Sequence, residues 1–341
     1  MFQELLKRVS ADISTVHAII QTNDRLREIM FGEGAVTRQE TELTILRQHI
    51  PGAMEWRVYD HCAVVTRLYA IYERFIKDLI SDWLQLLPDI FPLYTDLEET
   101  IQNTHRTGVG RLLCDLKKKR FEHLSIDEII RGLLCGVTGE EEYVLLPDAF
   151  LLQQNLWKGV LEQLFNGAGI PDAWRWVEKH RAIKDFVEKI LASENTAEGE
   201  LKELISYRND AAHGSPIDNV LGSNTLIELC YFVESLCQAL AELVTYKVFE
   251  RQKLIGLARE IGQITEWFKN PRAVVAKVEE TTLSVGGILF LVGEAHCQLA
   301  TIESIQIDGV ENNEVRVING REVGLKFDVD ARKKLRLYIL E

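Results

Sequence analysis

The residues of this chain that could act on a phosphate group lie in one short stretch, Ser206–Gly214, which contains Arg208, Asn209 and His213. A histidine that titrates near neutral pH can take a proton from a ribose 2′-hydroxyl or give one to a leaving oxygen. An arginine can hold a phosphate and stabilise the charge that develops on it. These residue types therefore fit cleavage of an RNA phosphodiester by the adjacent 2′-hydroxyl, without a metal, to leave a cyclic phosphate.

The spacing within the stretch determines how these side chains can meet. Asn209 and His213 are four residues apart, so they share a helix face and Asn209 can orient the imidazole. Arg208 and His213 are five residues apart, about 140° around a regular helix. They must therefore flank a common groove or meet a second copy of the motif across an interface. Gly214 suits the position after a helix end, and Pro216 stops the helix.

A second interpretation needs no chemistry. Arg208 and Asp210 are then solvated helix charges, and His213 is a C-terminal residue favoured by the helix dipole. The spacing alone is weak, because Arg175 and His180 have it too. That pair lacks the following Asn and the terminating Gly, so we interpret it as a solvated face of an amphipathic helix.

The elements that must position the stretch are helices up to about residue 270. Apolar residues recur every three or four positions, which is typical of amphipathic helices. One predicted helix ends before Pro88, and another begins with the capping box of Ser125 and Glu128. The predicted helices cover 1–30, 58–87, 125–135, 172–192, 198–213 and 223–268.

The pattern changes near Pro271, where short β-rich runs with turn residues begin. Asn319-Gly320 is a strong hairpin signal. Six such runs in about 70 residues predict a small closed barrel or sandwich. The expected fold is therefore α+β, an all-α helical bundle over 1–270 followed by a small β-barrel over 271–341, with the boundary at 268–272. The runs are 273–278, 286–293, 300–308, 314–320, 321–329 and 334–340.

Composition limits the classes of function. Hydrophobic residues make up 46% and charged residues 27%, which is typical of globular proteins. A net charge of -13 argues against a protein that holds nucleic acid through bulk basic charge, but not against a local basic pocket. The six cysteines form no CxxC pair and no zinc-ligand spacing, which predicts free thiols and no structural metal. We also expect no cofactor. No signal peptide or membrane span is visible, so we expect a cytoplasmic protein.

Two stretches resemble the HEPN superfamily. Arg208-Asn-x-x-x-His213-Gly is similar to its R-x4-6-H signature, and Leu68–Leu79 resembles the first core helix of its defence-associated members. The resemblance covers about 55–250, with 88–171 as an insertion and 1–50 as a leading helical segment. It implies a helical bundle, usually dimeric, in which two copies of the motif meet and cut RNA without a metal.

The resemblance also implies roles for individual residues. Arg208 would clamp the phosphate, His213 would be the general acid and base, and Asn209 would orient it. Glu73 would pair with Arg208, or it is a solvated helix charge. Ser215 stands where some toxins of the family carry a Tyr that a partner nucleotidyltransferase modifies, which counts against a toxin of that kind.

The function that the resemblance implies is a metal-independent endoribonuclease of a toxin–antitoxin or antiviral defence system, with a neutralising or complex-forming partner protein. The alternative is a non-catalytic HEPN-like subunit that binds RNA or protein, although such members generally lack the Arg or the His.

Two further features bear on the RNA. The basic run Lys117, Lys118, Lys119 and Arg120 is either an RNA path in the insertion or a solvated helix face. The C-terminal part resembles the β-barrel second domain of translational GTPases over 286–293, 300–307 and 320–327. That resemblance implies a translation-related RNA, such as tRNA, as the target. The hydrophobic pattern of any small barrel would produce the same likeness.

Overall fold

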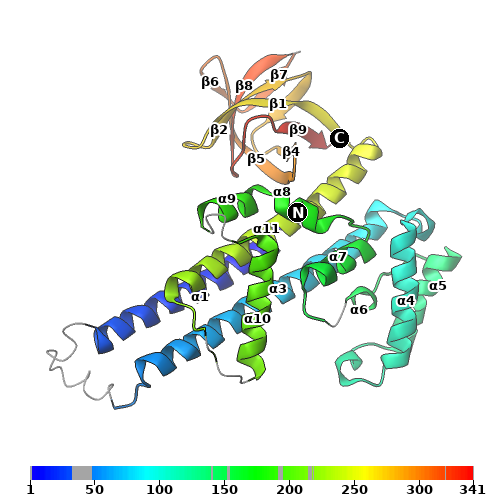
Figure 1. Ribbon diagram of the computed structural model, residues 1–341. Coiled ribbons are helices and arrows are strands. Elements are labelled where there is room, and N and C mark those ends of the chain that lie inside the picture. The colour runs from blue at the N-terminus through cyan, green and yellow to red at the C-terminus, as the bar shows by residue number, and fades with distance from the viewer. Residues whose placement is uncertain are drawn as a thin grey trace.

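Two architectures follow one another along the chain, a helical body and then a β-barrel, joined by helix α11 (Figure 1). The computed structural model describes residues 2–32, 48–139, 141–151, 154–190, 195–213, 217, 219–318 and 320–340. This arrangement confirms the predicted fold class, an all-α bundle followed by a small barrel.

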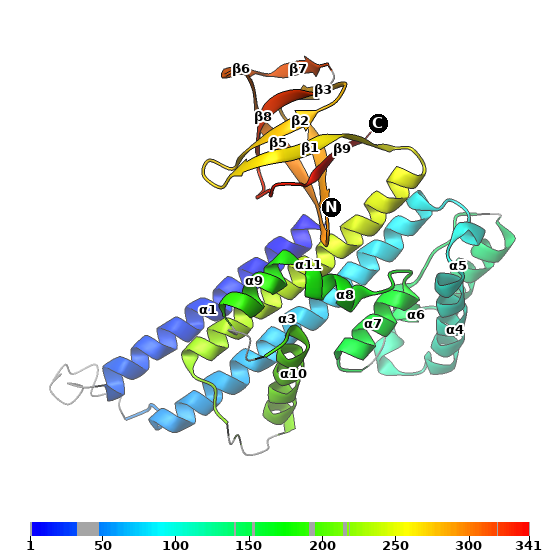
Figure 2. The same ribbon diagram turned by 45° about the horizontal axis from the view of Figure 1, so that its top comes forward.

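Three long helices form the centre of the body: α1 (Gln3–Phe31), α3 (Ala53–Ile90) and α11 (Ser223–Leu254). They pack against one another along their lengths (Figures 1 and 2). Every residue from 239 to 245 of α11 is buried, because α1, α3, α8, α9 and the barrel surround the helix. A helix that is covered on all sides gives a rigid support for the shorter elements.

The shorter helices of the body cross this support. Helix α10 (Ala197–His213) packs across α3, which Figure 2 shows clearly. Helices α8 (Ala173–Lys179) and α9 (Arg181–Lys189) both pack on α11. The single helix predicted over 172–192 is therefore wrong, because the extended backbone of His180 (φ -66°, ψ 138°) breaks it in two.

The insertion forms a separate helical lobe beside α3 (Figure 1). Helix α3 continues through Pro88 to Ile90 instead of ending before it. Pro88 removes only its own N–H bond, and the next turn is closed by the Phe91 N–H donating to the Leu87 carbonyl at 2.7 Å. The helices of the lobe are η2 (Tyr94–Asp96), α4 (Glu99–Asp115), η3 (Lys119–Phe121), α5 (Ile126–Thr138), α6 (Pro147–Phe150) and α7 (Lys158–Gly167). The capping box of Ser125 and Glu128 begins α5 as predicted.

Six antiparallel strands close into the barrel in the order β4-β9-β1-β2-β8-β5, and β5 pairs again with β4. Strand β6 (Val310–Asn312) pairs antiparallel with the end of β5, and β3 (Thr281–Ser284) pairs with β7 (Glu314–Val317) in a separate ribbon. All six predicted runs contain a strand. The barrel strands are β1 (Ala258–Phe268), β2 (Ala273–Val278), β4 (Ile288–Gly293), β5 (His296–Ile307), β8 (Arg321–Phe327) and β9 (Arg336–Leu340).

The barrel begins earlier than predicted. Strand β1 starts at Ala258, so the helical run predicted over 223–268 is too long, and the barrel includes residues that the boundary at 268–272 assigns to the helical part. In β1 the buried residues Ala258, Ile261 and Ile264 are three apart, and within this stretch the pairing register with β9 shifts between Glu260 and Gly262. Irregular pairing thus gives this strand the spacing of a helix.

Candidate functional site

Helix α10 carries the stretch that the sequence analysis singles out. Leu201, Leu204 and Ile205 are buried and hold the helix against the body, while Arg208 is only partly buried. The helix stays regular through His213, its last residue. Residues 214–216, on which the predictions for Gly214, Ser215 and Pro216 depend, lie outside the described residues.

The Arg208 guanidinium is fixed in place. Its central carbon lies 4.4 Å from the centroid of the Tyr69 ring on α3, a cation–π contact. Its Nη1 donates to Asn209 Oδ1 at 2.8 Å and to Asn155 Oδ1 at 3.3 Å. Stacking defines the plane of the guanidinium, and the two amide oxygens define its rotation within that plane.

Asn155 and Tyr69 join the site although the sequence does not predict them as site residues. The Asn155 Nδ2 donates to Asn209 Oδ1 at 3.3 Å, and the Tyr69 hydroxyl donates to Asn155 Oδ1 at 3.4 Å. Burial is the main cause that raises the pKa of Tyr69, so its hydroxyl keeps the proton that it donates. Tyr69 lies in the stretch that resembles the family's first core helix, which is the signal that could have identified it. Asn155 has no such signal.

Arg208 has no acidic partner in the part of the chain that the structure describes. The expected ion pair with Glu73 is not formed there, because the Glu73 carboxylate accepts from Lys77 Nζ at 2.9 Å, one turn along α3. Glu73 remains close enough for its charge to contribute to the raised pKa of Tyr69. The positive charge of Arg208 is therefore surrounded by neutral groups, namely a phenol ring and two carboxamides.

Asn209 does not orient His213 in this structure. Its Oδ1 accepts from Arg208 and Asn155, and no hydrogen bond joins it to His213 among the described residues. His213 is exposed at the end of α10. A single chain thus holds Arg208 firmly and leaves His213 facing solvent, without bringing the two side chains together.

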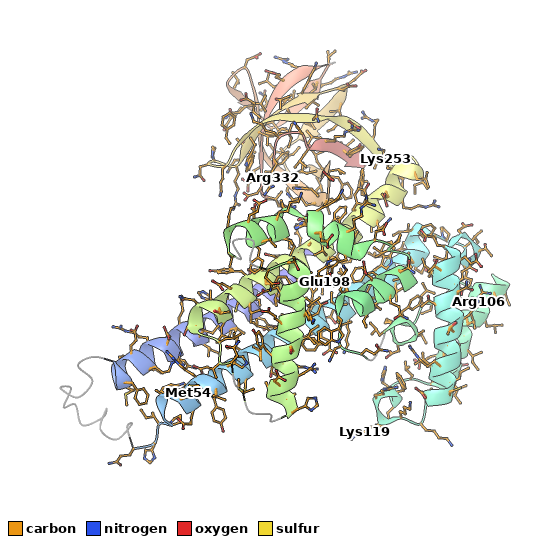
Figure 3. All side chains as sticks on the ribbon, in the orientation of Figure 1. Met54, Arg106, Lys119, Glu198, Lys253 and Arg332 are labelled. Carbon is orange, nitrogen blue, oxygen red and sulfur yellow. The ribbon has the colours of Figure 1, made fainter. Side chains whose placement is uncertain are left out.

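The basic run Lys117–Arg120 lies elsewhere, between α4 and α5 in the helical lobe of the insertion, where Figure 3 labels Lys119. All four side chains are exposed. Lys118 and Arg120 both bind Asp115, at 2.8 and 3.2 Å, and the Arg120 guanidinium stacks on Phe121 at 4.6 Å. No hydrogen bond or ion pair joins the run to α10 within the described ranges. The run is therefore not part of the Arg208 cluster, which consists of Tyr69, Asn155, Arg208 and Asn209.

The second match to the spacing, Arg175 and His180, proves to be different from the solvated face that we predicted. His180 is fully buried, and burial is the main cause that lowers its pKa. Its Nδ1 accepts from the Ala182 N–H at 3.3 Å and caps α9, and its Nε2 lies 3.3 Å from Glu242. His180 therefore has a structural role at a helix junction.

Nowhere in the described chain do three or more His, Cys, Asp or Glu form a group that could hold a metal ion.

A family model described as RiboL-PSP-HEPN matches residues 38–246, more than half of the chain. The chain belongs to this HEPN family. The match takes in α3, the insertion, α10 and most of α11, and it leaves out α1 and the barrel. It thus includes Tyr69, Asn155 and Arg208 in one family unit.

No curated protein matches the sequence significantly. No helix in the described ranges has the length and apolar character needed to cross a lipid bilayer.

Proposed function

We propose that this HEPN protein is a metal-independent endoribonuclease of a toxin–antitoxin or antiviral defence system, acting in the cytoplasm. Arg208 holds the scissile phosphate and stabilises its developing charge. His213 takes the proton of the ribose 2′-hydroxyl or gives one to the leaving 5′-oxygen. The 2′-oxygen attacks the adjacent phosphorus as the bond to the 5′-oxygen breaks, and the product strand ends in a cyclic phosphate.

The observation that supports this proposal most directly is the neutral surrounding of Arg208. A carboxylate beside an arginine forms an ion pair that cancels its charge. Arg208 is oriented by stacking and by amide oxygens, and among the described residues it has no carboxylate partner. A guanidinium that is pre-oriented but not neutralised is what binding of a phosphate requires.

The position of His213 favours a site shared between two chains. On a regular helix, five residues separate two side chains by about 140° and about 7.5 Å along the axis. The described structure keeps α10 helical between Arg208 and His213, so the two side chains do not lie side by side on one face of the helix. A homodimer that brings together the ends of two α10 helices would place the Arg208 of one chain near the His213 of the other.

RNA would reach this site along other parts of the molecule. The exposed run Lys117–Arg120 provides positive charge on the helical lobe that the insertion forms. The barrel, if it is related to the second domain of translational GTPases, would select a translation-related RNA such as tRNA. A partner protein that covers α10 would act as the neutralising subunit.

The direct test is cleavage of total RNA in EDTA by the wild-type protein, Arg208→Ala and His213→Ala. We expect the wild type to cleave RNA and leave cyclic-phosphate ends, and we expect no cleavage by Arg208→Ala or His213→Ala. Arg175→Ala is the matched control, because Arg175 is exposed and belongs to the second match to the spacing. Equal cleavage by all four proteins would remove Arg208 and His213 from the reaction, and cleavage lost in EDTA would exclude the metal-independent mechanism.

The second candidate is a non-catalytic HEPN-like subunit that binds RNA or protein. The separation of Arg208 and His213 within one chain favours it, because binding by Arg208 alone needs no histidine. Tight RNA binding by the wild type and by His213→Ala, without cleavage by either protein, would support this alternative.

A further inference from the structure

Asn155 lies where the chain returns from the insertion to the body, shortly before α7. Its carboxamide contacts three residues of the Arg208 cluster. The Oδ1 accepts from Tyr69 and from Arg208, and the Nδ2 donates to Asn209. The Oδ1 of Asn155, the Nη1 of Arg208, the Oδ1 of Asn209 and the Nδ2 of Asn155 thus form a closed ring of hydrogen bonds.

The backbone around Asn155 is itself held by α3. The Leu156 N–H donates to the Tyr69 hydroxyl at 3.2 Å, and the Tyr72 hydroxyl donates to the Leu156 carbonyl at 3.1 Å. The Leu156 side chain is only 3% exposed. The backbone next to Asn155 is therefore held in place by these two hydrogen bonds and by the buried side chain of Leu156.

A second contact ties the same segment to α10. Lys158 Nζ lies 2.7 Å from Glu198 Oε2, in the first turn of α10, where Figure 3 labels Glu198. The segment from Asn155 to Lys158 thus contacts α10 near both ends of that helix. A shift of the insertion against the body would move the acceptor of the Arg208 guanidinium.

We propose that Asn155 is a positioning residue that orients the Arg208 guanidinium toward an RNA phosphate, so that the insertion 88–171 completes the site. This inference rests on the proposed nuclease function. An amide oxygen orients a guanidinium without cancelling its charge, whereas a carboxylate in the same place would form a charge-assisted pair. In the described chain only the Nη1 of Arg208 has hydrogen-bond partners, which leaves its Nε and Nη2 for two oxygens of one phosphate.

The substitution Asn155→Asp places a negative charge beside Arg208 while it keeps the size of the side chain and its acceptor oxygen, and it loses only the Nδ2 donor to Asn209. With a carboxylate against Arg208, we expect the cleavage rate to fall at least about 100-fold, close to the loss in Arg208→Ala. Asn155→Ala removes the orientation but leaves the charge of Arg208, so we expect a loss of about 10-fold, mainly in kcat. The order of these two losses is the signature of a positioning role.

Binding supplies a readout that a purely structural role would not change. Each phosphate contact to a single strand adds about 0.7 to the slope of log K against log salt concentration. With a 2′-O-methyl RNA strand that cannot be cleaved, we expect Asn155→Asp and Arg208→Ala each to lower the slope by about 0.7. Asn155→Ala keeps the wild-type slope, because the guanidinium remains charged and unpaired.

The matched control is Asn103→Asp, the same change at an exposed position of α4 in the same insertion, where Asn103 accepts from Arg106 at 3.0 Å. It should leave cleavage and the salt slope unchanged. If Arg208→Ala loses activity while Asn155→Asp keeps it, the role of Asn155 is wrong and the proposed function stands. If the wild type neither cleaves nor binds RNA, or if Arg208→Ala behaves as wild type, the proposed function itself fails. A drop in the thermal unfolding midpoint of Asn155→Asp large enough to explain its lost activity would assign Asn155 a structural role and overturn the inference.

Discussion

The Arg181 guanidinium and the Glu242 carboxylate form a bidentate ion pair that joins α9 to the middle of α11, with N–O distances of 2.7 and 2.5 Å. Glu242 is only 5% exposed. The pair also reaches the barrel, since Glu242 accepts from the Cys297 N–H at 3.3 Å and Arg181 donates to Gln298 Oε1 at 3.3 Å. One ion pair thus connects two helices of the body to strand β5.

Breaking this pair should cost much of the stability of the protein. Glu242→Gln leaves the partly buried guanidinium of Arg181 without a counter-ion, and we expect the free energy of unfolding to fall by about 3–5 kcal/mol. Burial alone would raise the pKa of Glu242, but hydrogen bonds from His180 and Arg181 hold that pKa below its ordinary value. The stabilisation by the carboxylate is therefore present at neutral pH and lost as the pH falls below the ordinary range of a Glu.

Urea unfolding of the wild type and Glu242→Gln at pH 7 and pH 4 measures both effects. Glu250→Gln is the control, because Glu250 forms a partly exposed pair with Lys247 on the same helix and should cost at most about 1 kcal/mol. Equal losses for the two variants would show that the connection to the barrel does not depend on the Arg181 pair.

Two glycines of α4 provide a matched pair of stability tests. A Cβ at Gly108 would lie within 2.0 Å of the Ala149 carbonyl oxygen, whereas a Cβ at Gly110 would meet nothing within 4 Å. We expect Gly108→Ala to cost about 1–3 kcal/mol through overpacking against α6. Gly110→Ala should stabilise the protein by up to about 1 kcal/mol, because alanine is the better helix former.

Thermal unfolding of the two variants checks this expectation, and RNA cleavage tests its link to the site. Helix α6 precedes the segment of Asn155, so Gly108→Ala should lower cleavage while Gly110→Ala leaves it unchanged. Equal midpoints for the two variants would mean that α4 and α6 can separate without cost.

The sequence predicts the helices well where apolar periodicity is strong and uninterrupted, as in α1, α3 and α10. It also identifies the helix end on which Arg208 and His213 lie. It does not predict Asn155, because the hydrogen bond from Arg208 joins a residue of the insertion to a helix 53 positions later. No local pattern in the sequence indicates the path of the loop that carries Asn155. The same limit applies to Glu73, since the choice between Lys77 and Arg208 as its partner depends on how α10 crosses α3.

Two errors in the predicted elements have local physical causes. Strand β1 imitates a helix because its buried residues are three apart around a register shift against β9. His180 reads as a residue of a solvated face, yet the break between α8 and α9 turns it inward against Glu242. Apolar periodicity indicates a face only while the element is regular, and both positions are at irregularities.

Glu200 makes stability depend on pH near neutrality. This residue of α10 is 5% exposed, and burial together with the charges of Glu203 and Glu228 raises its pKa to about 7. The folded protein therefore still binds a proton at Glu200 at pH values where the unfolded chain, with a pKa near 4.5, has released it. The contribution of Glu200 to the stability of the folded state is fully present below pH 4.5 and is lost as the pH rises through 7. The shift corresponds to on the order of 3 kcal/mol.

Glu200→Gln removes the group that titrates. We expect this variant to be more stable than the wild type at pH 8, and the difference should shrink as the pH falls from 8 to 5. Chemical unfolding across that range measures it, with the exposed Glu188→Gln as the control. A stability difference between the wild type and Glu200→Gln that stays constant between pH 5 and 8 would contradict the raised pKa of Glu200.

Mixing two inactive variants tests whether one site takes residues from two chains. Arg208→Ala and His213→Ala should each be inactive alone. In an equal mixture half of the dimers contain one chain of each kind, and each mixed dimer has one of its two Arg–His pairs intact. We therefore expect the mixture to regain about a quarter of the wild-type cleavage rate after subunit exchange, as an isologous dimer requires. The regular helix between the two residues, with about 140° between their side chains, is the reason to expect this recovery. A mixture that stays inactive, although size-exclusion chromatography shows mixed dimers, would show that each chain must supply both residues to its own site.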